Sequence, residues 1–165
     1  VADELTIDVV AHGDGAASGW AASATPGDEV AVSGPGRGYD IDVNANSYLL
    51  VGDETAIPAI AQLLEAMPDD LSTIVLIEVT DPEARLELPA GPETMITWLD
   101  LPDGSVPGAA MVEAVEQLVT MPEAVWVAGE AAAMQRIRTH LFDGRGLTRS
   151  QATVRGYWKL GRSAT

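Results

Sequence analysis

The chain of 165 residues contains no cysteine and a single phenylalanine. Without cysteine it forms no disulfide, offers no thiolate nucleophile and cannot hold zinc or an iron–sulfur cluster through sulfur. This composition is compatible with a reducing cytoplasm, where we expect the protein to act. No apolar run approaches the roughly 20 residues of a membrane-spanning helix. The first ten residues carry acids and lack a basic segment, so no signal peptide is expected.

Basic residues are scarce and unevenly placed. Nine Lys and Arg stand against 25 Asp and Glu, a formal net charge of −16, and Lys159 is the only lysine. Residues 136–165 hold seven bases and one acid, formally +6, whereas residues 1–135 hold two bases and 24 acids, formally −22. The acidic body opposes nucleic acid and anionic membranes as partners. The basic end could attract an anionic small molecule, or its arginines could simply form solvated helix faces.

From residue 47 onward, apolar runs alternate with helical patterns. The runs are apolar at consecutive positions, which is typical of parallel strands buried on both faces. The five predicted strands are residues 47–52, 72–79, 94–99, 124–129 and 152–158. The three predicted helices are residues 53–67, 108–121 and 130–143, the second burying Met111, Val115, Leu118 and Val119. We therefore predict an α/β domain of three layers on a parallel five-stranded sheet.

Residues 1–45 have a different pattern, with β character and little helix. Residues 4–11 and Glu29–Ser33 have strand-like composition, and Gly/Pro-rich turns follow both. The Ala-rich segment 16–24 predicts one or two helical turns.

Two predicted strands end in a glycine that leads directly into a helix, at Gly52 and Gly129. Ligands of parallel sheets bind outside the carboxyl ends of the strands, where helix N-termini attract a pyrophosphate. A glycine there would allow a ligand to approach the backbone closely. Neither turn is a G-x-G-x-x-G or P-loop motif, and a glycine after a buried strand is often only a tight turn. The acids Asp53, Glu54 and Glu130 also oppose a bare phosphate.

Taken in order, seven segments resemble the siderophore-interacting protein family, FAD-dependent ferric-siderophore reductases of the ferredoxin–NADP reductase superfamily. The segments are AHGDGAASGWA, TPGDEVAVSGPGR, YLLVGDETAIPAIAQLLEAMP, IVLIEV, TWL, VWVAGEAAAMQRIRTHL and VRGYWKLGR. The similarity spans nearly the whole chain. It implies that residues 46–165 form the NAD(P)H-binding domain and that residues 1–45 are the end of an antiparallel flavin-binding β-barrel.

The resemblance also implies roles for individual residues. The pyrophosphate-side loop of NADPH or NADH corresponds to Gly52, Asp53, Glu54, Thr55 and Ala56, and the second nucleotide-facing turn to Gly129 and Glu130. The segment that touches the FAD pyrophosphate corresponds to His12, Ala17 and Ser18 with their neighbours. The aromatic pair near the flavin corresponds to Tyr157 and Trp158. Arg155, Lys159 and Arg162 flank that pair and are candidates for attracting an anionic ferric siderophore.

The activity that the resemblance implies is hydride transfer from NAD(P)H to FAD, followed by single-electron reduction of Fe(III) in the siderophore and release of Fe(II). Such chemistry needs little acid–base catalysis, and no catalytic or metal-binding constellation stands out. The family's Arg-x-Tyr-Ser/Thr flavin motif is absent, so the chain should begin inside the barrel and should not bind FAD tightly alone. The choice between NADH and NADPH stays open, with Arg85, Arg136 or Arg138 as candidates for a 2′-phosphate.

Two other functions fit parts of the pattern. A non-enzymatic nucleotide-binding or docking module, paired with a separate flavin partner, would explain the missing barrel. A receiver-like signalling domain would explain the acids that follow strands, Asp53, Glu54, Asp81 and Asp100. A receiver also requires a lysine after its last strand, and the one candidate is Lys159 at the end of the chain.

Overall fold

A computed structural model describes residues 7, 9, 16–31 and 38–161 of the chain, which divides into two compact units, Val1–Tyr39 and Asp40–Thr165. In the first unit, helix α1 (Ala16–Ser23) confirms the predicted helical turns. The predicted strand Glu29–Ser33 is wrong for its described residues 29–31, which have no regular structure. The segment 4–11 lies outside the described residues apart from two isolated positions.

The second unit is built on a five-stranded sheet in which every neighbouring pair is parallel, as predicted. Its strands are β1 (Ser47–Asp53), β2 (Ser72–Val79), β3 (Thr94–Asp100), β4 (Ala124–Glu130) and β5 (Ala152–Trp158). The spatial order is β3-β2-β1-β4-β5, so β1 and β4 lie side by side at the centre. Receiver-like proteins have the order 2-1-3-4-5 instead, and the receiver alternative therefore fails on topology.

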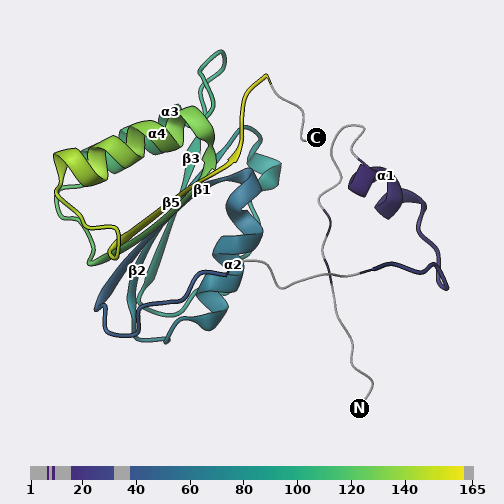
Figure 1. The fold of residues 1–165 in the computed structure, drawn as a ribbon, viewed down its shortest axis with the longest axis horizontal. Helices are drawn as coiled ribbons and strands as arrows, with labels where there is room; N and C mark the ends of the chain where they lie inside the picture. Colours follow the sequence, from purple (N-terminus) through teal and green to yellow (C-terminus); the bar gives the residue numbers. More distant parts are fainter. Residues whose placement is uncertain (1–6, 8, 10–15, 32–37, 162–165) are drawn as a thin grey trace. The chain divides into compact units, whose positions relative to one another are not determined.

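Helices cover both faces of this sheet, which gives the predicted three layers. In Figure 1, α3 (Ala109–Gln117) and α4 (Ala131–Thr139) cover one face and α2 (Ile57–Ala66) covers the other. Three short elements complete the unit: η1 (Glu54–Ala56), η2 (Pro82–Ala84) and the π-helical turn η3 (His140–Gly144). Within the described residues, no helix has the length and apolar character that a membrane crossing requires.

The main hydrophobic core lies between the sheet and the pair α3 and α4. Strand side chains that point to this face are completely or almost completely buried against methionine, isoleucine and leucine side chains of the helices. The core includes Leu49, Val51, Leu76, Val125, Val127, Val154, Met111, Met134, Ile137 and Leu141. The consecutive apolar residues of the central strands therefore reflect burial on both faces, because their alternate side chains pack toward α2.

Helix α3 ends earlier than its periodicity predicts. The helix stops at Gln117, Leu118 takes an extended ψ of 121°, and Val119 is 91% exposed instead of buried. The guanidinium of Arg145 donates hydrogen bonds to the carbonyls of Leu118 and Val119 and so satisfies this helix end. Because Arg145 comes from a distant turn, the local pattern gave no sign of this stop.

Gly52 permits close packing between the end of β1 and helix α2. A Cβ atom at this buried position would lie 2.5 Å from Ala56 Cβ and 3.0 Å from Ile60 Cδ1. Atoms of the protein itself therefore occupy the space that glycine leaves open, and the position is a packing requirement of the strand-to-helix turn.

We expect Gly52→Ala to destabilise the chain by about 1–3 kcal/mol, because the added methyl group must displace Ala56 or Ile60. Chemical denaturation monitored by circular dichroism measures this loss. Gly144→Ala is the matched control, since its nearest neighbour atom would be 3.7 Å away and its φ is not in the left-handed region. A Gly52→Ala variant as stable as the control would contradict the packing argument.

Candidate functional site

The carboxylate of Asp53 joins three strand ends at the carboxyl edge of the sheet. Asp53 ends β1 and is 7% exposed. Its Oδ1 accepts hydrogen bonds from the backbone N–H of Thr55 at 3.0 Å and from the Thr55 hydroxyl at 2.5 Å. Its Oδ2 accepts from the backbone N–H of Glu130 in β4 at 2.9 Å and from the indole Nε1 of Trp158 in β5 at 2.8 Å.

Gly129 explains how this carboxylate fits between the strands. A Cβ atom on Gly129 would lie 2.6 Å from Oδ2 of Asp53, and the residue has a φ of 157° that side chains rarely tolerate. The glycine thus leaves room for a buried side chain of the protein. Gly52 and Gly129 also lie on adjacent strands, because Gly52 pairs with Ala128 in the register of β1 and β4.

Two further buried glutamates cap the helices that follow the sheet. Glu78, the second-last residue of β2, accepts hydrogen bonds from the backbone N–H groups of Gly108, Ala110 and Met111 at 2.6–3.1 Å, at the start of α3. Glu130 ends β4 and accepts from Ala132 and Ala133 at 2.5 and 3.1 Å, at the start of α4. Each carboxylate satisfies donors that have no partner within their helix.

These caps bear directly on how a pyrophosphate could bind. The expectation from sequence was that free N–H groups at the helix starts would hold it. In the structure those groups at α3 and α4 already donate to carboxylates, and the N–H of Thr55 donates to Asp53. The helix starts therefore do not suit a phosphate, and an anionic group at this edge needs cationic side chains instead.

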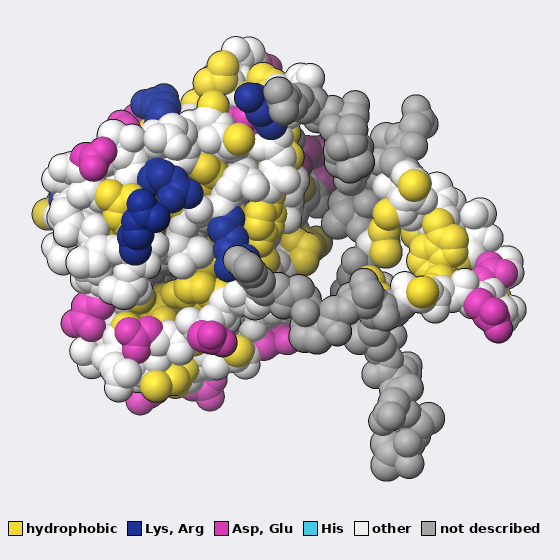
Figure 2. Space-filling model, viewed as in Figure 1, with side chains coloured by type: hydrophobic (Ala, Val, Ile, Leu, Met, Phe, Trp, Pro, Cys, Tyr) yellow, Lys and Arg dark blue, Asp and Glu magenta, His cyan; other side chains and the backbone are white. Residues whose placement is uncertain are grey.

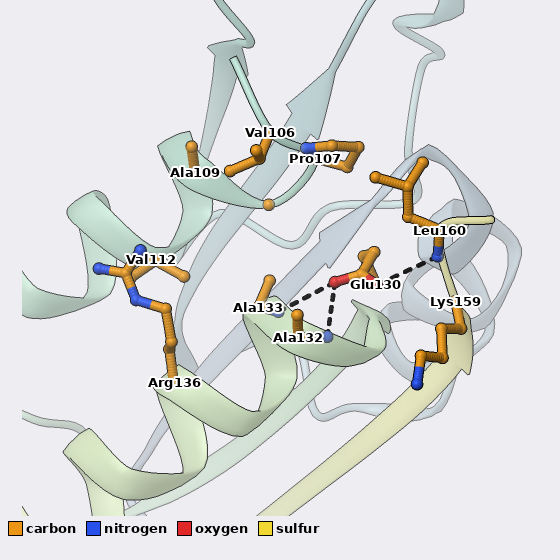
Figure 3. Close-up of a pocket in the computed structure, with 11 residues that line it drawn as sticks. Val106, Pro107, Ala109, Val112, Glu130, Ala132, Ala133, Arg136, Lys159 and Leu160 are labelled. Atoms are coloured by element: carbon orange, nitrogen blue, oxygen red, sulfur yellow. Dashed lines mark hydrogen bonds between the residues drawn. The ribbon is translucent and has the colours of Figure 1, made fainter.

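A pocket of about 300 Å³ opens between the first turns of α3 and α4. Its walls are mainly apolar and include Val106, Pro107, Ala109, Val112 and Leu160. Figure 3 shows Arg136 and Lys159 on opposite sides of this pocket, with Glu130 between them. The volume and the apolar lining with few polar groups are typical of small-molecule sites.

A second pocket of about 90 Å³ lies next to the first, with Pro107 lining both. It is bordered by the ring of Trp158 and by Thr55 and Thr80. Three carboxylates also line it, those of Asp53, Glu54 and Glu78, and no Lys or Arg is among its lining residues. This pocket suits a neutral or cationic ring and disfavours a phosphate.

The structure separates the predicted aromatic pair. Trp158 turns toward the carboxyl edge and donates to Asp53, whereas Tyr157 is 44% exposed and packs edge-on against Trp126, with ring centroids 6.2 Å apart. Burial raises the pKa of Tyr157, and nearby Arg155 opposes that shift. The two aromatic residues therefore contribute to different surfaces. Trp126 itself is buried core, as its strand position predicts.

The remaining predicted residues fall into three groups. Glu54, Thr55 and Ala56 form η1 beside Asp53, and Lys159 lines the larger pocket, whereas Arg155 lines neither pocket. Ala17 and Ser18 lie in α1 of the first unit, where Ser18 is buried. His12 and Arg162 lie outside the described residues. Whether any of these residues holds a cofactor stays a prediction.

The arginines considered for a 2′-phosphate have different surroundings. Arg85 pairs with Asp100, and Arg138 donates to the carbonyl of Val154 at 2.6 Å. Arg136 borders the larger pocket, and its ion pair with Glu116 is loose, at 3.6 Å. Figure 2 shows dark blue Lys and Arg side chains gathered over the upper and central part of the sheet unit, with acids along its lower edge.

Glu78 was missed from the sequence, although a signal was present. It is a charged residue within the otherwise apolar strand of residues 72–79, and a buried acid in such a strand requires donors nearby. The pocket walls Val106 and Pro107 carried no signal, because they belong to a loop whose position depends on the packing of α3 against α4. Among the described residues, no cluster of three potential metal-binding side chains is present.

Comparisons with known proteins agree with this geometry. The siderophore-interacting protein family matches residues 45–161, and the siderophore-interacting FAD-binding domain matches residues 1–39. An uncharacterized protein of Mycobacterium tuberculosis is 37% identical over 98% of the chain and 62% of its own length. The ferric vibriobactin reductase ViuB of Vibrio cholerae is 33% identical over 98% of the chain and 61% of its own length.

A crystal structure of a siderophore utilization protein from T. fusca superposes with a TM-score of 0.72. It is 37% identical, and the match covers 94% of this chain and 60% of the other. The chain thus spans about three-fifths of the length of the curated relatives that it matches.

Glu130 gives the site a testable pH dependence. Burial alone would raise the pKa of Glu130, but the N–H groups of Ala133, Leu160 and Ala132, together with Lys159, hold it below the ordinary value. The stabilisation by this carboxylate is therefore complete above the unfolded pKa of about 4.3 and is lost as pH falls through the lower folded value.

We expect Glu130→Gln to reduce the free energy of unfolding at pH 7 by about 1–3 kcal/mol, because an amide replaces one acceptor oxygen with a donor. The difference from wild type should shrink as pH falls below about 4.3, because the unfolded chain then binds a proton that the native carboxylate, with its lower pKa, still excludes. Urea unfolding at pH 7 and pH 3.5 measures both values. Glu65→Gln, at an exposed position on α2, is the control. A difference in the free energy of unfolding between wild type and Glu130→Gln that is the same at pH 3.5 as at pH 7 would refute the stabilising role of the Glu130 carboxylate.

Proposed function

Because the chain belongs to the siderophore-interacting protein family, we propose that it is the nicotinamide-nucleotide-binding portion of a flavin-dependent ferric-siderophore reductase. The relative named ferric vibriobactin reductase supports this activity class, and the ferredoxin reductase-like sheet supports a nicotinamide cofactor. The match covers 61% of that relative's length, so the activity proposed is the one that a full-length relative would carry out. The cysteine-free composition agrees with action in a reducing cytoplasm.

The observation that carries the proposal is the pocket between α3 and α4 at the carboxyl edge of the sheet. Its apolar walls suit the adenosine half of NADPH, with Val106, Pro107 and Ala109 on one side. Lys159 lines this pocket, directly after Trp158 of the smaller one in the chain, and would neutralise the pyrophosphate. Arg136, at the opposite end, would meet the 2′-phosphate, which favours NADPH over NADH.

The smaller pocket beside Trp158 would take the nicotinamide ring. Its carboxylates repel phosphates but are compatible with a ring that becomes positively charged when it gives up hydride. Thr55 and Thr80 border the pocket with hydroxyl groups, which can hydrogen-bond the carboxamide. The nucleotide would therefore lie with its two ends in adjacent pockets of opposite electrostatic character.

The flavin would contact the first unit, since the siderophore-interacting FAD-binding domain matches residues 1–39. Ala17, Ser18 and His12 are the residues that the family resemblance assigns to the FAD pyrophosphate. When bound, FAD accepts hydride from the nicotinamide and passes electrons singly to the ferric ion of the siderophore substrate. This chain's contribution is to bind and orient the nucleotide. Arg155, Lys159 and Arg162 would attract the anionic ferric siderophore to the same edge.

We expect Lys159→Gln to weaken binding of NADPH and NADH alike by about tenfold, because both nucleotides carry the pyrophosphate. Arg136→Gln should weaken NADPH by a similar factor and leave NADH unchanged. Isothermal titration calorimetry of the purified chain measures both affinities. Arg149→Gln, a basic residue that lines neither pocket, should bind as wild type does.

The enzymatic and non-enzymatic alternatives separate in an activity assay. The chain with added FAD, NADPH and a ferric siderophore is monitored with a ferrous-ion chelator. We expect the chain to bind NADPH but to form little Fe(II), because its match to the flavin-binding family covers only residues 1–39. Absence of binding to either nucleotide, with or without FAD, would refute the nucleotide-binding role.

A further inference from the structure

The end of β5 and the two residues after it line both pockets of the proposed nucleotide site. Trp158 borders the smaller pocket, and the next two residues, Lys159 and Leu160, line the larger one. The segment 158–160 therefore forms a partition between the pockets.

Two carboxylates from the central strands hold this partition. Asp53 in β1 accepts the indole N–H of Trp158 at 2.8 Å, and Glu130 in β4 accepts the backbone N–H of Leu160 at 3.2 Å. Asp53 is 7% exposed and Glu130 is 4% exposed, so both bonds are shielded from competing water. The hydrogen bond from Trp158 to a carboxylate is charge-assisted and is stronger than a neutral pair.

An irregularity in the sheet turns Trp158 toward Asp53. Gly129 pairs with Gly156, but the next residue of β4, Glu130, pairs with Trp158, so Tyr157 is an extra residue in β5. Since successive side chains of a strand point to opposite faces, one inserted residue reverses the direction of every later side chain. The bulge therefore places Trp158 at the carboxyl edge and leaves Tyr157 on the outer surface.

The room for this contact is also built into β4. Oδ2 of Asp53, which accepts the indole N–H, occupies the space that a side chain at Gly129 would need. The bulge in β5, the glycine in β4 and the buried carboxylate in β1 thus converge on a single hydrogen bond.

We propose that Asp53 is a positioning residue that fixes the indole of Trp158 as the wall of the nicotinamide pocket. The inference rests on the proposed nucleotide-binding function. It predicts that the Asp53–Trp158 bond affects ligands that contain nicotinamide and leaves the adenosine end unaffected. NADP⁺ and 2′,5′-ADP are suitable probes, because 2′,5′-ADP keeps the adenosine and its phosphates but lacks nicotinamide.

Trp158→Phe tests the bond most directly, because it keeps an aromatic ring and removes the N–H donor. We expect the variant to bind NADP⁺ about tenfold more weakly than wild type and to bind 2′,5′-ADP within a factor of two. Trp98→Phe is the matched control, since Trp98 lines neither pocket. Equal losses for both ligands, or no loss for NADP⁺, would overturn the proposal.

The link to Asp53 is tested by a double-mutant cycle with Asp53→Asn. If Asp53 acts through Trp158, the Asp53→Asn/Trp158→Phe variant should bind NADP⁺ no more weakly than the weaker single variant. Additive losses would show that the two residues act independently. Because Asp53 also holds Thr55 and Glu130, Asp53→Asn could fail to fold, and the outcome then depends on the next measurement.

The indole N–H of Trp158 provides a direct spectroscopic signal. In a ¹⁵N-labelled chain, four tryptophan indole resonances are expected, and the one missing from Trp158→Phe belongs to Trp158. NADP⁺ should shift this resonance, whereas 2′,5′-ADP should leave it in place. If the wild type binds neither probe, the proposed function fails; if it binds both and NADP⁺ leaves the resonance unmoved, only the positioning role fails.

Discussion

The carboxylate of Asp53 is the contact on which the carboxyl edge of this sheet depends. One buried side chain accepts four hydrogen bonds and so connects the end of β1 to η1, to β4 and to β5. A buried carboxylate is tolerated when its oxygens accept hydrogen bonds, and here each oxygen accepts two. The nearby glycine in β4 and the bulge in β5 are the adjustments that this arrangement requires.

The capped helices distinguish this edge from a phosphate-binding loop. In many dinucleotide sites the helix N-terminus is left open, and the ligand supplies the acceptor. Here Glu78 and Glu130 supply it, at α3 and α4, and the positive helix ends offset part of the carboxylate charge. Under the proposed function, recognition of an anionic ligand would therefore depend on cationic side chains that line the pocket, Arg136 and Lys159.

Much of the fold was predictable from the sequence, and the site was less so. The three inner strands follow from consecutive apolar residues, which burial on both faces requires, whereas the edge strands β3 and β5 are partly exposed. The observed bounds of all five strands differ from the predicted ones by at most one residue. Gly52 and Gly129 were identified from the sequence as positions that give a ligand access to the backbone. In the structure the space beside Gly52 holds Ile60, and the space beside Gly129 holds Asp53. The caps by Glu78 and Arg145, and the opposite directions of Tyr157 and Trp158, depend on contacts between distant segments, which periodicity does not encode.

The helix caps have a consequence for turnover. Within the described part of the chain, no buried side-chain polar atom lacks a hydrogen-bond partner. The backbone N–H groups at the starts of α3 and α4 that donate to Glu78 and Glu130 likewise have partners within the protein. The residence time of a bound anion would then depend on its contacts with side chains at the surface, and water and salt compete readily for such contacts. For a nucleotide bound as proposed, such a pocket would favour rapid exchange over long retention.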